Sequence, residues 1–191
     1  MSDTQTERLQ AFLDAHPSLE TVELVLTDPN GVARGKWAPV GTLKKAFGTG
    51  VNFPLSLHGL DIWGSEVAET GLHIESGDRD GFCVAVPETL AALPWLDGAL
   101  VEPDLATIAQ VMLETVTPEG EGFGGCARTV LRRAVERLAA DGLTAVCAVE
   151  LEFHLLTPQA RTGAPFVVAE TDAAFDNTHM YDLGALAEKA P

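Results

Sequence analysis

One segment decides how this chain folds: Thr144-Ala-Val-Cys-Ala-Val-Glu-Leu-Glu-Phe-His-Leu-Leu156. Apolar and β-branched residues dominate it and neither Gly nor Pro interrupts it, which predicts a β-strand. Successive side chains of a strand point to opposite faces, so Glu150, Glu152 and His154 share one face and the apolar residues between them share the other. A row of charge therefore faces either water or a cavity.

The two carboxylates have a spacing that suits divalent cations. At about 3.3 Å per residue, the Cα atoms of Glu150 and Glu152 lie about 6.5 to 7 Å apart on a strand. Side chains that diverge from such a pair can each hold a separate hard cation, and Mg²⁺ or Mn²⁺ prefers carboxylate oxygens. A solvated strand surface can carry the same Glu-Leu-Glu pattern, so the pattern alone leaves a metal site and a polar face both open.

A helix and a glycine-rich segment precede this strand. Apolar residues recur at helical spacing from Val130 to Ala139 and stop at Asp141-Gly142, which predicts an amphipathic helix. Before it, residues 120–125 contain four glycines, the best candidate for a linker in the chain. We therefore place a domain boundary there, giving domains at residues 1–120 and 121–191.

The first of these domains has strand and turn signals. A capping-box pattern predicts a helix from Thr4 to His16, and Asp28-Pro-Asn-Gly31 supplies the turn of a hairpin within residues 22–37. The segment from Gly48 to Gly81 is rich in turn-forming residues and is predicted to be a long loop. Further strands are predicted at residues 82–86 and 108–116, with a packed turn between residues 89 and 98.

Two groups of cationic side chains could bind anions. Arg34 and Lys36 share one face of the predicted hairpin, and several arginines lie on the polar face of the predicted helix. A solvated edge strand and a solvated helix face also explain them, and we favour those interpretations over anion sites.

Composition excludes several classes of protein. The chain has 191 residues, 46% of them hydrophobic, and a formal net charge of −16. The hydrophobic content can fill a core, and the negative charge disfavours nucleic acid and anionic membranes. No long apolar run or signal-peptide pattern occurs, which predicts a cytoplasmic protein. Cys83, Cys126 and Cys147 are widely separated, so reduced thiols are expected in place of a disulfide or zinc site.

The order of the motifs resembles that of the glutamine synthetase family. The hairpin Asp28–Lys36, the stretch Gly77–Asp80, the segment Thr89–Trp95, a helix, and then Glu150-Leu-Glu152-Phe follow one another as they do in that family. The branch that joins glutamate to amines and polyamines is the most similar. The resemblance implies an α+β fold, with a β-grasp N-terminal domain followed by the beginning of a glutamine synthetase-type catalytic α/β domain, the rest of which would follow residue 191.

The resemblance also implies a reaction and its participants. The whole protein would be an ATP-dependent ligase that makes a γ-glutamyl amide from glutamate and ammonia or an amine through γ-glutamyl phosphate, working as a homo-oligomer. Glu150 and Glu152 would each bind one of two Mg²⁺ or Mn²⁺ ions. Asp61, within Leu57–Gly64, would handle the incoming nitrogen in a neighbouring subunit, although a loop-capping aspartate explains it as well. His154 matches no ligand of the family.

Two further expectations follow from what this sequence contains. The remaining metal ligands and the cationic groups that balance the charge of a transferred phosphate are missing, so the 191 residues alone are expected to be inactive. The rival interpretation is a non-enzymatic β-grasp binding or assembly module. The choice among ammonia, ethanolamine, putrescine and an aromatic amine stays open.

Overall fold

The computed structural model describes residues 3–72, 75, 77–97, 102 and 105–152. The chain divides into two compact units, Met1–Ala145 and Val146–Pro191, and each is treated by itself. The helices and strands described below all belong to the first unit. Within the described ranges, none of the helices combines the length and the apolar character that crossing a bilayer requires.

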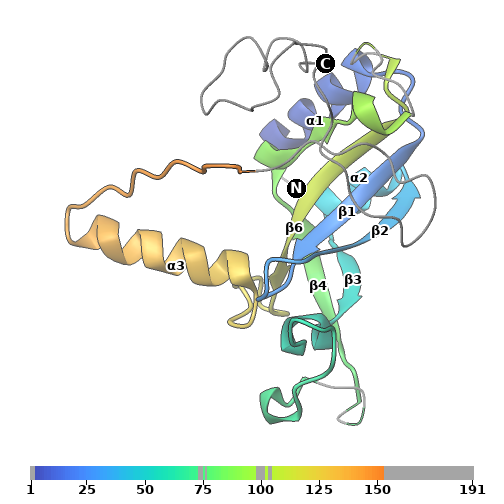
Figure 1. The fold of residues 1–191 in the computed structure, drawn as a ribbon. Coiled ribbons are helices and arrows are strands. Elements are labelled where there is room, and N and C mark those ends of the chain that lie inside the picture. The colour runs from blue at the N-terminus through green and yellow to red at the C-terminus, as the bar shows by residue number, and fades with distance from the viewer. Residues whose placement is uncertain (1–2, 73–74, 76, 98–101, 103–104, 153–191) are drawn as a thin grey trace, which may run out of the picture. The chain divides into compact units, whose positions relative to one another are not determined.

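The first unit is built on a mixed sheet of six strands flanked by helices (Figure 1). The strands run in the order β2-β1-β6-β4-β3, and the short β5 also pairs with β6. The central pair, β1 and β6, is parallel, whereas every other pairing is antiparallel. The strands are β1 Thr21–Thr27, β2 Ala33–Pro39, β3 Val51–Pro54, β4 Asp80–Ala85, β5 Ala91–Ala92 and β6 Ile108–Val116, and the helices are α1 Asp3–Ala15, α2 Thr42–Phe47 and α3 Ala127–Ala140.

The predicted N-terminal elements are confirmed. Helix α1 spans Asp3–Ala15, close to the predicted range, and buries Leu9 against the sheet core. The hairpin of β1 and β2 forms around the predicted turn, in which Gly31 has φ +81°, a conformation that glycine adopts at little cost. Strands β4 and β6 also lie where alternation of apolar residues predicts them.

One face of the sheet carries the hydrophobic core. Strand β1 contributes Val22, Leu24 and Leu26, which are at most 2% exposed. Helices α1 and α2 cover this face, and Phe47 of α2 is one of the residues that pack there. The remaining core members are Leu9, Leu19, Leu43, Ala46, Val51, Phe53, Cys83, Ala85, Ala109, Val111 and Leu113.

The sheet curls so that its two outermost strands are bridged. The Nζ of Lys36 on β2 donates a hydrogen bond to the carbonyl of Asn52 on β3 at 3.1 Å and lies 4.6 Å from the ring centroid of Phe53. Such a cation–π contact contributes on the order of 0.5–1 kcal/mol at an exposed site. Lys36 is therefore more than the solvated edge residue predicted from the sequence, because it links two strands that are not neighbours in the sheet.

Helix α3 confirms the prediction for this segment and its end. It spans Ala127–Ala140, and Gly142 follows with φ +74°, as expected just beyond a helix. The buried hydroxyl of Thr129 donates to Glu114 of β6 at 2.8 Å, and Arg132 forms an ion pair with the same carboxylate at 2.8 Å. Arg132 is thus paired, which the prediction of a wholly solvated helix face missed.

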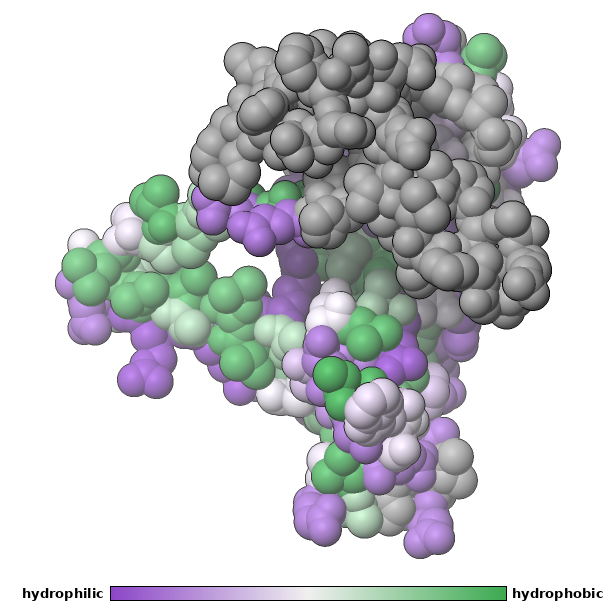
Figure 2. All heavy atoms as spheres, viewed as in Figure 1, coloured by the Kyte–Doolittle hydropathy of each residue, from purple (hydrophilic) through white to green (hydrophobic). Residues whose placement is uncertain are grey.

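The apolar face of α3 is open to solvent. Its exposed apolar side chains belong to Val130, Leu131, Val135 and Leu138, with exposed fractions between 38% and 65%. Figure 2 shows them as a band of hydrophobic colour along the helix. The described residues therefore leave uncovered the face by which an amphipathic helix normally packs.

Two sequence predictions are wrong. Residues 144–152 form no strand, although they are the described part of the strand predicted at residues 144–156. A strand needs a partner for its backbone groups and a core for its apolar face, and the described residues provide neither for this segment: Val146, Val149 and Leu151 are 80–91% exposed. The predicted loop at residues 48–81 instead contains β3 and short 3₁₀ segments at Leu55–Gly59 and Ala68–Thr70.

Candidate functional site

Asp61 lies in a closed loop between the two 3₁₀ segments. Its carboxylate Oδ1 accepts hydrogen bonds from the backbone N–H groups of Trp63 and Ser65, each at 2.8 Å. Its backbone N–H donates to the Ser65 carbonyl at 2.8 Å, and Gly64, with φ +83°, donates to its carbonyl at 3.0 Å. The side chain thus caps its own loop, as one of the two sequence interpretations anticipated. Both side-chain hydrogen bonds described for Asp61 are accepted by Oδ1.

The Asp61 loop presents apolar side chains to solvent. Ile62 is 71% exposed and Trp63 is 88% exposed. An adjacent pair of large apolar side chains at a loop tip is unusual in the absence of a partner surface. The hydrogen bonds around Asp61 hold this tip in one conformation.

The loop is fastened to the hairpin of β1 and β2. The side-chain amide of Asn30 donates to the Leu60 carbonyl at 2.8 Å, which ties the hairpin turn to the residue just before Asp61. Asn30 is itself positioned by its backbone N–H, which donates to Oδ1 of Asp28 at 2.9 Å. The position of the candidate residue therefore depends on a buried carboxylate in a different segment.

Asp28 is 1% exposed and fully paired. Besides Asn30, the backbone N–H of Val32 donates to Oδ1 at 2.9 Å, and the Arg34 guanidinium contacts Oδ2 at 3.0–3.1 Å. Burial opposes ionisation, but the hydrogen bonds from Val32, Arg34 and Asn30 outweigh it, so the pKa of Asp28 lies below its ordinary value. Asp28 remains charged at neutral pH. Arg34 is paired with this carboxylate, so the structure does not support the alternative that Arg34 binds an external anion.

His58 fixes the other side of the loop to the sheet. Its Nε2 lies 2.8 Å from the hydroxyl of Thr115 on β6, and its ring lies 5.5 Å from that of Phe123. Cys83 approaches the same hydroxyl at 3.4 Å. Burial lowers the pKa of His58, against an opposing attraction from Asp28, so the imidazole is neutral at pH 7.

Glu150 and Glu152 occupy a different setting from the predicted one. Both are exposed, and both lie in the second compact unit on backbone without regular structure. Among the residues that the structure describes, no group of three or more His, Cys, Asp or Glu side chains is arranged to hold a metal ion. His154 lies outside the described residues. The carboxylate oxygens suit a hard cation chemically, but the described part of the chain adds no further ligand.

Two of these features were not found from the sequence. Asp28 was interpreted only as a turn residue. The one feature of the sequence that could have indicated its ion pair is the cationic residue Arg34, six positions later in the same hairpin. Glu114 lies in the strand predicted at residues 108–116 and had no role of its own in that prediction. Burial opposes its ionisation, but hydrogen bonds from Arg132 and Thr129 hold its pKa below the ordinary value.

Comparison with known proteins identifies relatives for both compact units. The family described as "Glutamine synthetase, catalytic domain" matches residues 124–189. A gamma-glutamylputrescine synthetase of Escherichia coli (strain K12) is 39% identical over 81% of this chain and 31% of its own length. A gamma-glutamylanilide synthase of Acinetobacter sp is 30% identical over 78% of this chain and 31% of its own length.

One solved structure supports the fold. A glutamine synthase homolog shares 21% sequence identity and a TM-score of 0.51 over 64% of this chain and 27% of the other. At this level of identity the likeness concerns the fold only. The chain spans about a third of the length of the two enzymes above.

Proposed function

Because this chain belongs to the glutamine synthetase family, we propose that it forms part of an ATP-dependent ligase that makes γ-glutamyl amides. ATP would transfer its terminal phosphoryl group to the side-chain carboxylate of glutamate, giving γ-glutamyl phosphate and ADP. The nitrogen of ammonia or an amine would then attack the acyl carbon, lose a proton and release phosphate. The observation that carries this proposal is the catalytic-domain match over residues 124–189, which includes Glu150 and Glu152.

We favour an organic amine over ammonia as the nucleophile. The names of the two relatives specify γ-glutamylputrescine and a γ-glutamylanilide as products, whose amine components are putrescine and aniline. The chain is 39% identical to the putrescine enzyme and 30% identical to the anilide enzyme. Side-by-side turnover with putrescine, ethanolamine, aniline and ammonium would rank the nucleophiles, and a protein that uses ammonium alone would contradict this preference.

Glu150 and Glu152 are proposed to hold one divalent cation each, Mg²⁺ or Mn²⁺. The proposal is supported by the carboxylate chemistry and by the exposure of both side chains, which leaves them available. When bound, such ions neutralise charge on phosphate and carboxylate oxygens. The two glutamates would then fix where that charge is neutralised.

Calorimetry with Mn²⁺ on the longest protein that contains this chain tests the metal assignment. Glu150→Gln and Glu152→Gln should each remove about one equivalent of tight Mn²⁺ binding, because an amide is a poorer ligand for a hard cation. Glu119→Gln, an exposed glutamate in the turn after β6, is the matched control and should bind as the parent does. Unchanged Mn²⁺ binding in both Glu150→Gln and Glu152→Gln would make the assignment wrong.

Asp61 is proposed to accept the proton of the incoming amine, or to bind its ammonium form, within a homo-oligomer. Two observations support the proposal: hydrogen bonds to Oδ1 close the loop, and the adjacent tip exposes Ile62 and Trp63 as an oligomer contact would. The capping role and the chemical role are compatible, since a carboxylate has two oxygens.

We further propose that residues 1–120 are a β-grasp domain and that a catalytic domain begins at residue 121. Parallel pairing of β1 with β6 between antiparallel flanks supports the first part. The family match from residue 124 and the uncovered apolar face of α3 support the second, because a larger domain would bury that face.

The 191 residues alone are proposed to be inactive. Among the described residues, the two carboxylates proposed to bind metal are not joined by the further ligands of a two-metal phosphoryl-transfer site. Incubation of this chain with ATP, glutamate, Mn²⁺ and putrescine should give no γ-glutamyl amide. Product formation at any rate above the uncatalysed one would refute the proposal.

A further inference from the structure

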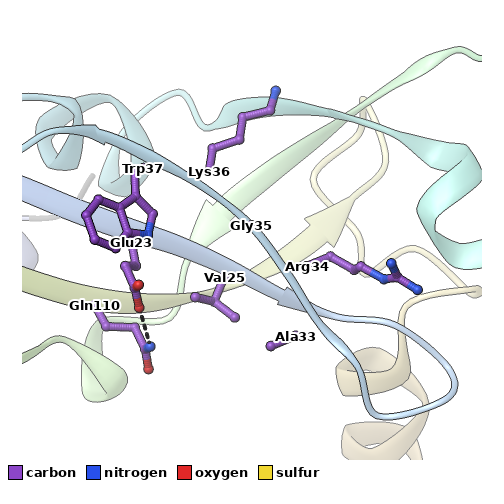
Figure 3. Close-up of a pocket in the computed structure, with 8 residues that line it drawn as sticks. All are labelled: Glu23, Val25, Ala33, Arg34, Gly35, Lys36, Trp37 and Gln110. Atoms are coloured by element: carbon purple, nitrogen blue, oxygen red, sulfur yellow. Dashed lines mark hydrogen bonds between the residues drawn. The ribbon is translucent and has the colours of Figure 1, made fainter. Parts of the chain in front are cut away.

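A hollow of about 230 Å³ lies on the face of the sheet opposite the core, over β1, β2 and β6 (Figure 3). The side chains that shape it are those of Glu23, Val25, Ala33, Trp37 and Gln110, with Gly35 leaving the space between them.

The strand register explains the shape of the hollow. Trp37 of β2 is the cross-strand partner of Glu23, and Gln110 of β6 is the partner of Glu23 on its other side. Paired residues point to the same face, so an indole, a carboxylate and an amide form one row. In the next row Gly35 pairs with Val25, and the missing side chain leaves an apolar depression beside the indole.

Gly35 cannot readily be replaced by a larger residue. A Cβ built on it would lie 2.6 Å from the backbone carbonyl oxygen of Leu24, closer than real Cβ atoms come. The depression is therefore fixed by the backbone and does not depend on a side-chain rotamer. Val25, which is only 8% exposed, forms its floor.

The charge that faces the hollow is negative. The carboxylate Oε2 of Glu23 accepts a hydrogen bond from the Gln110 amide at 2.8 Å, which orients the group and leaves it accepting capacity. Two cations also border the hollow, but Figure 3 shows Arg34 and Lys36 pointing away from Glu23. Arg34 is paired with Asp28, and Lys36 contacts β3 on the other side of the sheet.

An oriented carboxylate beside an exposed indole, above an apolar floor, is a combination that suits a cation with an aliphatic body. The indole face attracts an ammonium group, and the carboxylate accepts a charge-assisted hydrogen bond from it. Trp37 is 64% exposed and is thus open to a ligand. The Glu23 charge would repel an anion, and a neutral apolar ligand would displace water from that carboxylate without satisfying the accepting capacity that Gln110 leaves unused.

We propose that this hollow binds a small organic ammonium ion, with its charged nitrogen between Glu23 and Trp37 and its aliphatic chain over Val25 and Gly35. This binding goes beyond the ligase activity and does not depend on it. A site so open should bind weakly, in the millimolar range, since only one side of the ligand is buried.

Titration of the ¹⁵N-labelled 191-residue chain with n-butylammonium chloride, followed by NMR, tests the proposal. The Trp37 indole and the backbone amides of Val25, Gly35 and Gln110 should shift together and saturate. n-Butanol tests whether the charge is needed, and sodium chloride at equal ionic strength tests for a salt effect. Both should leave these signals in place.

The variants separate recognition from packing. Glu23→Gln keeps the hydrogen-bonding shape and should weaken n-butylammonium binding about tenfold or more, the scale on which a charge-assisted contact contributes. Trp37→Ala should weaken it severalfold, and the exposed-site control Glu119→Gln should not change it. The signals of the other residues show whether each variant is folded.

Three results would overturn the proposal. The first is an absence of shifts, or equal shifts with n-butanol. The second is unchanged affinity in folded Glu23→Gln. The third is that the same signals move on raising protein concentration without amine, because the hollow would then receive a side chain of a second copy.

Discussion

Replacing Asp28 tests how the hairpin turn supports the Asp61 loop. Asp28→Ala removes two hydrogen bonds from backbone N–H groups and the ion pair with Arg34. A hydrogen bond to a charged group contributes about 1.5–3 kcal/mol, and breaking a buried ion pair by removing one partner costs about 3–5 kcal/mol. Arg34 has a side chain 27% exposed and can regain water, so we expect the low end, about 3 kcal/mol.

Urea unfolding followed by circular dichroism measures this loss, and pH provides a second signature. The folded-state pKa of Asp28 is depressed, so its contribution to stability is present above the ordinary carboxyl pKa and is lost as pH falls through the folded value. The parent should lose stability below about pH 4, and Asp28→Asn should lose less over the same window. Glu119→Gln is the control for an exposed acid.

Hydrogen exchange links the same change to the site. Asp28→Ala should speed exchange of the Trp63 and Ser65 amides, because Asn30 no longer holds Leu60 in place. If Asp28→Ala costs less than about 1 kcal/mol, or destabilises the hairpin while leaving exchange in the Asp61 loop unchanged, the reasoning is wrong.

Three other predictions concern the core, the buried imidazole and the loop. Leu113→Ala should cost about 2–5 kcal/mol in urea unfolding, because Leu113 is 2% exposed in the core, and a cost below 1 kcal/mol would contradict its placement. The pKa of His58 is depressed in the folded state, so as the pH falls the unfolded state binds a proton before the folded state does. The free energy of unfolding should therefore decrease as the pH drops below about 6.5. Urea unfolding between about pH 5 and 8 should show a weaker pH dependence in His58→Gln. Asp61→Asn should keep the loop closed, since an amide oxygen can accept the same two hydrogen bonds, whereas Asp61→Ala should open it. Hydrogen exchange of the Trp63 and Ser65 amides distinguishes the two variants. Equal exchange rates in both would refute the capping role.

Local chemistry made the N-terminal part predictable. The Asp28-Pro-Asn-Gly31 turn and the alternation of Ile108–Val116 act over a few residues, so the sequence alone indicates the hairpin and strand β6. Strand β3 was not predicted, because it has only four residues and ends in proline, so its sequence resembles that of the surrounding loop. The parallel pairing of β1 with β6 depends on contacts far apart in sequence, which periodicity does not encode.

The segment containing Glu150 and Glu152 shows the opposite error, because a strand predicted from the sequence is absent from the described residues of that segment. Its alternation predicts a strand whether or not a neighbouring strand is present, because periodicity describes the side chains and not their partners. In the described residues the backbone of 144–152 has no such partner and remains irregular. The two carboxylates therefore keep their proposed role through chemistry and family membership, without the strand geometry on which their spacing was first calculated.

Product analysis tests the central claim most directly. The longest protein that contains this chain would be incubated with ATP, Mn²⁺, glutamate and putrescine, and the products would be measured by mass spectrometry together with ADP. The proposed function predicts γ-glutamylputrescine or another γ-glutamyl amide in equal amount to ADP, with both lost in Glu150→Gln. Formation of neither with any amine or ammonium, by a folded protein that binds ATP, would contradict it.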